Sequence, residues 1–336
     1  MGDKSVIRIV SFGGGKGQAR VAEAVRDIPG VQLSVIVPDT DNTGSTGGLR
    51  ENYRKARGYL GDYTRCAKAL TSNPKIAELL DYRFPEFGNH SLRNLTLLAA
   101  EELFGRKEGG ELFHYLLRLR ENGKPEGEEH CVLPATIQKA KLRVNTVGGE
   151  VEDDEVIEGL GSNPLFKPEL HEIVSVKLIP LERGPVVKAY RPALNAIRKA
   201  DYIVICPGSL ITSISAALLP EGIKGAIMSS GAKVVLFLNL MTCTGETSGY
   251  SATRFVEWVE DMIGRECDFI VHNTQPISEE TTRRYAKEEK VVVTSGEFPK
   301  NGHRLIGAPL AETTPEGILY HCSSEIRKVL TKIIAV

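Results

Sequence analysis

The amino-acid sequence predicts an α/β fold built on a doubly wound, mainly parallel sheet. Short runs rich in Val and Ile recur along the chain, and most of them lead through Gly, Ser, Thr or Asn into an amphipathic stretch. Continuous apolar runs separated by helical patterns are typical of a parallel sheet that helices cover on both faces. Ligands of such sheets bind beyond the carboxyl ends of the strands. The polar loops that follow the apolar runs are therefore the first candidates for a functional site.

The apolar runs predict a Rossmann-like alternation of strands and helices. Directly behind the first loop, the apolar residues between Val21 and Ile28 fall on one face at helical spacing, which predicts a helix there. The predicted strands are VIRIVSF (6–12), LSVIV (33–37), YIVIC (202–206), KVVLFLNL (233–240), DFIVHN (268–273) and KVVVTS (290–295).

The middle of the chain has a different pattern and is predicted to be an insertion into a single domain, 1–336. Four helical patterns follow one another in residues 66–122, and residues 131–180 read as a β-hairpin-rich stretch with Gly148 and Gly149 at a turn. The insertion thus covers 66–180. The nucleotide-binding core is then made of 1–65 and 181–336.

Composition excludes several classes of protein. The net charge of −1 argues against a nucleic-acid-binding protein, which usually has a basic excess. The apolar run VVLFLNLM is far shorter than the roughly 20 residues that cross a bilayer, and no signal peptide is evident, so we expect no membrane association. The six cysteines are scattered without a C-x-x-C pair, which favours the reducing cytoplasm.

The first loop, FGGGKG, has glycines where a phosphate could lie close to the backbone. It does not match the P-loop pattern, because Lys16 is followed by Gly17 and Gln18, and it lacks the last glycine of the dinucleotide fingerprint. Bare N–H groups at a helix N-terminus still attract anions, and a lysine adds charge. A tight strand–helix turn is the alternative. The predicted phosphate-binding residues are Gly13, Gly14, Gly15, Lys16 and Gly17.

The second loop, PDTDNTGSTGGLR (38–50), combines carboxylates, hydroxyls and glycines. Asp41 is a candidate ligand for a hydrated divalent cation, and the neighbouring hydroxyl and amide groups suit a ribose or sugar. The alternative is an ordinary turn with side-chain caps. The candidate ligand-binding residues are Asn42, Thr43, Gly44, Ser45, Thr46 and Arg50.

Three later strand ends supply further candidates. CPGSLITS is not a nucleophile elbow, because Ile211 occupies the last glycine position; Gly208 and Ser209 instead open a helix that binds phosphate or is merely capped by the serine. In MTCTGETSGYS, Glu246 has three roles open to it: base, metal ligand or helix N-terminal charge. The other candidates at these ends are Thr242, Thr247, Tyr250 and Asn273.

These loops together resemble one family. GGGKG…DNTGSTGGLR…GDYTRCAKAL resembles the N-terminal half of the YvcK/CofD-like proteins, which include the gluconeogenesis factors and the 2-phospho-L-lactate transferases. NHSLRNLTLLAA, with Asn94, is similar to another family segment, and PGSLITSISAALLPEGI and NLMTCTGETSGYSA are similar to its later loops. The resemblance covers most of residues 5–290, in the same order.

The gluconeogenesis-factor branch is the closer one, on its Met-Thr-x-x-Gly-Glu-Thr and GSTGGLR segments. This resemblance implies a protein that binds a nucleotide sugar such as UDP-N-acetylglucosamine and regulates carbon flux and wall-precursor synthesis through a partner enzyme. Apolar helices in the insertion favour a homo-oligomer.

The transferase branch implies the alternative, a magnesium-dependent transfer of a phosphorus-containing group. Asp41, Asp62 and Glu246 would then hold the metal, while Lys16 and Arg50 neutralise phosphate charge. The chain departs from the family pattern at three positions: Lys16 stands in place of Thr, Asn42 in place of an acid, and Arg93 in place of the glycine before Asn94. A nicotinamide dehydrogenase fits the predicted sheet but lacks the fingerprint.

Overall fold

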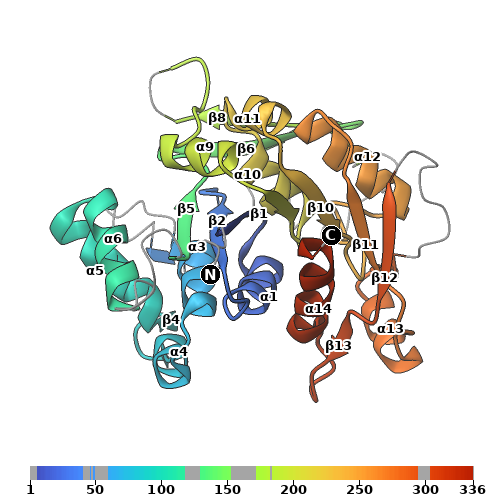
Figure 1. Ribbon diagram of the computed structural model, residues 1–336, viewed down its shortest axis with the longest axis horizontal. Coiled ribbons are helices and arrows are strands. Elements are labelled where there is room, and N and C mark those ends of the chain that lie inside the picture. The colour runs from blue at the N-terminus through green and yellow to red at the C-terminus, as the bar shows by residue number, and fades with distance from the viewer. Residues whose placement is uncertain are drawn as a thin grey trace, which may run out of the picture.

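The core of the protein is a seven-stranded, all-parallel sheet (Figure 1). The computed structural model describes residues 6–40, 46, 48–49, 60–117, 129–152, 172–181, 184–293 and 303–335. The strands are β1 (Ile7–Phe12), β2 (Val31–Val37), β5 (Cys131–Pro134), β9 (Tyr202–Ile205), β10 (Lys233–Phe237), β11 (Phe269–Asn273) and β12 (Arg304–Ala308).

In the strand order, β12-β11-β10-β9-β1-β2-β5, the chain changes the side of the sheet on which it adds new strands. From β1 the chain adds β2 and then β5 on one side, and afterwards adds β9 to β12 on the other. The reversal therefore lies between β1 and β9, where Phe12 is paired with Ile205 at the carboxyl ends of both strands. Such a switch point is where a doubly wound sheet opens a crevice for ligands.

Helices cover both faces of the sheet (Figure 1). Successive strand residues alternate between two separate cores: Val204 packs into one, and Ile203 and Ile205 into the other. The predicted doubly wound α/β class is therefore confirmed. The first core is closed by α1 (Gly15–Val25), α3 (Leu60–Leu70) and α14 (Ser323–Ile334), and the second by α9 (Arg191–Arg198), η2 (Leu210–Ser215), α10 (Ala216–Leu218), α11 (Ile223–Ser229) and α12 (Ala252–Ile263).

The middle of the chain contributes helices and a small second sheet. The predicted hairpin is present, as β6 and β7 of an antiparallel sheet, but its turn is at Val147 and Gly148, since Gly149 already pairs with Thr146 as the first residue of β7. Residues 131–134, which the sequence pattern assigns to the insertion, instead form the edge strand β5 of the central sheet. The elements are α4 (Pro74–Asp81), β3 (Arg83–Phe84), β4 (His90–Ser91), α5 (Leu92–Phe104), α6 (Arg106–Leu116), β6 (Ala140–Thr146), β7 (Gly149–Glu152) and β8 (Ile173–Pro180).

The C-terminal part differs from the sequence expectation at one strand. Residues 290–293 of the predicted strand 290–295 make only an isolated bridge, between Val292 and Met241, and the central sheet ends instead with β12. After β12, a short hairpin of β13 (Ala311–Thr313) and β14 (Leu319–His321) packs beside α13 (Glu279–Ala286) and leads into α14. Among the helices that the structure describes, none is long and apolar enough to span a membrane.

Candidate functional site

The first loop lies against the loop that follows β9, at the switch point of the sheet. A Cβ added to Gly17 would collide with the backbone carbonyl of Pro207, and one added to Gly14 would collide with the Ser213 side chain. On its other side the loop meets α3, where a Cβ on Gly15 would lie within 2.8 Å of the Arg65 guanidinium. These glycines therefore allow close packing of α1 against neighbouring segments of the same chain.

Gln18 anchors the N-terminal turn of α1 to the central sheet. Its side-chain amide is fully buried and donates to the carbonyl oxygens of Ser11, at 2.9 Å, and Ile36, at 3.0 Å. One side chain thereby ties α1 to β1 and β2. A glutamine at this position explains why the last glycine of the dinucleotide fingerprint is missing here: the position carries a structural hydrogen-bond donor.

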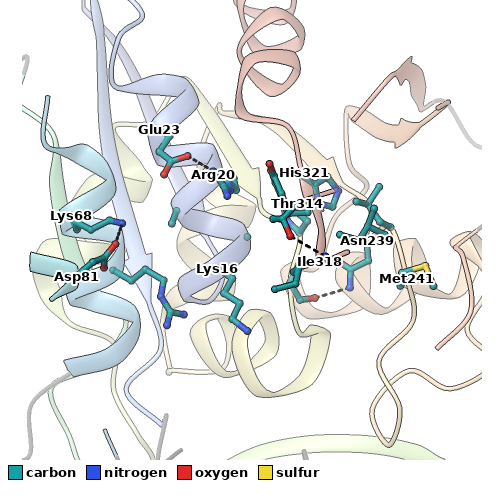
Figure 2. Close-up of a pocket in the computed structure, with 18 of the residues that line it drawn as sticks. Lys16, Arg20, Glu23, Lys68, Asp81, Asn239, Met241, Thr314, Ile318 and His321 are labelled. Carbon is teal, nitrogen blue, oxygen red and sulfur yellow. Dashed lines mark hydrogen bonds and ion pairs between the residues drawn. The ribbon is translucent and has the colours of Figure 1, made fainter. Parts of the chain in front are cut away.

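A cavity of about 690 Å³ opens in front of α1, next to the switch point. Figure 2 shows α1, with Lys16 and Arg20, running between Lys68 and Asp81 on one side and Asn239 and His321 on the other. The volume lies in the range of sites that hold a whole small molecule. Its described lining includes six cations, Lys16, Arg20, Arg65, Lys68, Arg83 and Arg93, and two acids, Glu23 and Asp81.

The two acids neutralise only part of this charge. Asp81 pairs with Lys68 at 2.6 Å and with Arg93, and Glu23 pairs with Arg20 at 3.0 Å. The three other cations, Lys16, Arg65 and Arg83, form no ion pair with any residue in the described ranges. The cavity therefore presents a net positive surface, which attracts anionic groups of a ligand.

Arg93, one of the three positions expected to depart from the family pattern, is part of the cationic lining. It is 4% exposed, and burial is the largest influence on its guanidinium, lowering its pKa, while Asp81 acts in the opposite direction. Its Nε has no hydrogen-bond partner among the described residues. A buried guanidinium N–H without a partner is a position that a ligand oxygen can satisfy.

The opposite wall comes from the segment after β10, from α13 and from the β13–β14 hairpin, and it is more apolar. The Arg20 guanidinium lies 4.3 Å from the centre of the Tyr320 ring, so that α1 and the hairpin are in direct contact. The Tyr285 hydroxyl accepts a hydrogen bond from the Leu319 backbone N–H at 3.0 Å and holds the hairpin against α13. The lining residues of this wall are Asn239, Leu240, Met241, Tyr285, Thr314, Ile318, Leu319, Tyr320 and His321.

Glu246 has a structural role at the start of the helix after β9. Its carboxylate accepts hydrogen bonds from the Ser209 hydroxyl at 2.6 Å, the Ile211 N–H at 3.1 Å and the Thr212 hydroxyl at 3.1 Å. It is 2% exposed, and burial raises its pKa although these hydrogen bonds favour the charged form. Of the three roles that the sequence leaves open, this geometry corresponds to the helix N-terminal charge.

Ser209 is the N-cap of the same helix and accepts a hydrogen bond from the Thr212 N–H at 2.9 Å. Gly208 donates its N–H to the Asn239 side chain at 2.9 Å and accepts a hydrogen bond from that amide at 2.7 Å. The N–H groups of Ile211 and Thr212, which a phosphate would use, are thus occupied by the protein's own side chains. Gly208 still lines the cavity.

The candidate residues after β10 and β11 hold loops in place through hydrogen bonds to the backbone. The Thr242 hydroxyl accepts from the Val291 N–H at 2.8 Å, and the Thr247 hydroxyl accepts from the Cys243 N–H at 2.8 Å. The side-chain amide oxygen Oδ1 of Asn273 accepts hydrogen bonds from backbone N–H groups that follow β12, including that of Leu310 at 2.9 Å. None of these three candidates is part of the described cavity lining.

Three further candidates are buried beside the core. Tyr250 packs its ring against Phe255, with the ring centres 5.8 Å apart. Asn94, on α5, accepts a hydrogen bond from the Thr64 hydroxyl at 2.6 Å and thereby connects α5 to α3. Thr46 is 3% exposed.

The remaining candidates of the second loop, Asp41, Asn42, Thr43, Gly44, Ser45 and Arg50, lie outside the described residues. Asp62, on the first turn of α3, lies beside Gly15 and Arg65. The described ranges contain no group of three or more His, Cys, Asp or Glu side chains that could hold a metal ion. With Glu246 committed to Ser209, Ile211 and Thr212, the described part of the predicted magnesium set is reduced to Asp62.

Most cations of the cavity lie outside the strand-end loops that the sequence pattern singles out. Arg20, Arg65, Lys68 and Arg83 lie on helices and on a short strand rather than in strand-end loops. One signal was available: Lys16 and Arg20 are four residues apart, as are neighbours on one helix face, and Arg65 and Lys68 are three apart. Only the fold shows that these two charged faces and Arg83 surround the same cavity.

Comparison with known proteins identifies the family. The family described as 2-phospho-L-lactate transferase CofD matches residues 9–311. The chain belongs to the CofD family. The match ends at Ala311, the first residue of β13, so most of the β13–β14 hairpin lies beyond it.

Relatives in the CofD family carry the name gluconeogenesis factor. The chain is 35% identical to the gluconeogenesis factor of Halalkalibacterium halodurans over 294 residues, which cover 85% of this chain and 84% of that protein. It is 31% identical to the gluconeogenesis factor of Bacillus subtilis, over 86% of this chain and 84% of that one. A crystal structure of a UPF0052-family protein from Bacillus halodurans superposes with a TM-score of 0.82 at 29% identity, covering 96% and 99% of the two chains.

Proposed function

We propose that the protein binds a nucleotide or nucleotide sugar in the basic cavity and acts as a regulator in carbon and envelope-precursor metabolism, through a partner enzyme. The observation that carries this proposal is the cavity itself. It lies next to the switch point, has room for a whole small molecule and presents cations that form no ion pair within the described ranges. The relatives named gluconeogenesis factor support the regulatory part.

The cations of the cavity would hold the phosphates. Lys16 is exposed at the start of α1, and Arg93 has a buried N–H without a partner among the described residues. An ammonium and a guanidinium on different elements can contact two phosphoryl groups at once. The uncharged part of the lining, which includes Leu240, Met241 and Ile318, suits the base or the sugar.

The test is calorimetric titration of the protein with UDP-N-acetylglucosamine, with magnesium and then with EDTA. We expect binding in both conditions, and a ligand concentration of 100 times Kd should raise the free energy of unfolding by about 2.7 kcal/mol. Lys16→Ala should weaken binding about tenfold through loss of a charge-assisted contact. Lys332→Ala removes the same charge from an exposed position on α14, away from the cavity, and should leave the affinity unchanged.

Two results contradict this proposal. If neither UDP-N-acetylglucosamine nor any other uridine nucleotide stabilises the protein, the cavity does not have this ligand. If Lys16→Ala and Lys332→Ala affect binding equally, the ligand binds elsewhere.

The second candidate function is a magnesium-dependent transferase of phosphorus-containing groups, which the name of the matched family favours. Asp41 and Asp62 would be its metal ligands. Turnover of a deazaflavin acceptor that requires magnesium and disappears in Asp41→Asn would establish this activity in place of simple binding.

A further inference from the structure

His321 lies in the wall of the cavity and has a defined tautomer. Its Nε2 is 3.0 Å from the backbone carbonyl oxygen of Leu238, at the end of β10. A carbonyl oxygen can only accept a hydrogen bond, so Nε2 carries the hydrogen and donates it. In a neutral imidazole the other nitrogen, Nδ1, then has a free lone pair and is a hydrogen-bond acceptor.

Nδ1 is the ring nitrogen that remains for a ligand. His321 is the last residue of β14 and one of the residues that line the cavity, on the side away from Lys68 and Asp81 (Figure 2). No residue in the described ranges hydrogen-bonds to Nδ1. The side chain is 7% exposed, and its ring is held by the bond to Leu238, so the lone pair has a fixed position.

The imidazole ring is also neutral, although six cationic side chains line the same cavity. Burial lowers the pKa of His321 to about 4, which keeps the imidazole uncharged at physiological pH. In a cavity whose described charged side chains are mostly hydrogen-bond donors, His321 is thus a neutral acceptor.

We propose that His321 is a specificity-determining residue, which binds a hydroxyl or N–H group of a phosphorylated ligand through Nδ1. This inference rests on the proposed function and specifies the ligand class. The phosphates of such a ligand face Lys16 and the arginines, because the Nδ1 lone pair repels a phosphate oxygen. The opposite end of the ligand carries the donor.

The size of the cavity supports a ligand with two distinct ends. A volume of about 690 Å³ is much larger than one phosphate group requires. The lining also includes Leu240, Met241 and Ile318, which suit the carbon skeleton of a sugar or a base rather than a second anion.

The alternative is that His321 only anchors the hairpin to β10 through Leu238. His321→Gln separates the two roles, because the glutamine amide N–H group can replace Nε2–H as the donor to Leu238 but leaves no acceptor at Nδ1. His321→Leu removes both the donor to Leu238 and the acceptor at Nδ1. Comparison of these variants therefore distinguishes ligand recognition from structural support.

The experiment is calorimetric titration of the wild type and the two variants at pH 7.5, with two probes. UDP-N-acetylglucosamine carries phosphates and sugar and base donors, whereas inorganic pyrophosphate carries only the anionic part. For His321→Gln we expect the Kd of UDP-N-acetylglucosamine to rise about 3- to 10-fold, as for one lost hydrogen bond, and the Kd of pyrophosphate to change less than about twofold. In the wild type, the ¹⁵N resonance of Nδ1 should shift on addition of UDP-N-acetylglucosamine and not on addition of pyrophosphate.

The outcomes separate this inference from the proposed function. If His321→Gln binds both probes as the wild type does, or loses affinity for both equally, His321 does not select the ligand and the inference fails while the proposed function stands. If the wild type binds neither probe, the proposed function fails, and the inference fails with it. His321→Leu should show the same selectivity loss with a lower melting temperature; a lower melting temperature with the ratio of the two Kd values unchanged identifies a purely structural histidine.

Discussion

Gly17 on α1 lies directly against the backbone carbonyl of Pro207, in the loop after β9, with no room for a Cβ between them. This contact joins the two strand ends on either side of the switch point, since β1 leads into Gly17 and β9 leads into Pro207. The glycine-rich loop is thus required by internal packing, independently of any ligand. The same packing exposes Lys16, the neighbour of Gly17, to the cavity.

Gly17→Ala should destabilise the protein by about 1 to 3 kcal/mol, because the added methyl group overlaps backbone that cannot rotate away. The measurement is urea unfolding followed by circular dichroism. Gly225→Ala is the matched control: Gly225 is also helical, on α11, and nothing lies within 4 Å of its added Cβ. The control should be neutral or stabilising by up to about 1 kcal/mol through helix propensity. Equal effects in the two variants would contradict the packing role of Gly17.

Glu246→Ala should cost about 2 to 4 kcal/mol of stability, since it leaves buried donors of Ser209, Ile211 and Thr212 without an acceptor. Glu246→Gln should cost less than about 1 kcal/mol, because an amide oxygen still accepts and the raised pKa of Glu246 shows that burial opposes its charge. Chemical denaturation of both variants measures this difference. A Gln variant as unstable as the Ala variant would mean that the negative charge, rather than the hydrogen bonds, is required.

His321 should make stability depend on pH below neutrality. Its pKa is about 4 in the folded protein, against about 6.5 when unfolded, so the unfolded chain binds the proton more tightly between these values. Stability from the neutral imidazole is complete above about pH 6.5 and is lost as the pH falls towards 4, by about 2 kcal/mol at about pH 5. Denaturation at a series of pH values tests this, with His321→Gln as the reference that lacks the titrating group. Parallel curves for the two proteins would show that His321 is not responsible.

Ligand binding should weaken as salt concentration rises, because Lys16 is exposed and its attraction for phosphate is screened. Lys16→Ala should show a smaller salt dependence than the wild type when UDP-N-acetylglucosamine affinity is measured at several sodium chloride concentrations. Lys332→Ala should keep the wild-type slope. An unchanged slope in Lys16→Ala would place Lys16 away from the ligand phosphates.

Much of the fold could be predicted from local patterns. The Val- and Ile-rich runs of β1, β2, β9, β10 and β11 are buried on both faces, so their composition alone distinguishes them from surface strands. The late run 290–295 has the same composition, and yet its described residues stay outside the sheet, where the edge position is taken by Arg304–Ala308. A local pattern specifies that a segment suits a strand, whereas its partner is chosen by the whole sheet.

The candidate site also combines features that local sequence predicts with features that only the fold decides. The sequence by itself determined the class of fold, the strand-end loops and the positions of Lys16 and Gly208, because strand composition and glycine content are local properties. Only the tertiary structure decided that Glu246 and Asn273 hold loops together, and that Arg65, Arg83 and Arg93 meet α1 and His321 around one cavity. Hydrogen-bond partners and shared cavities depend on residues that are distant in the chain, and no local pattern records which of them the fold brings together.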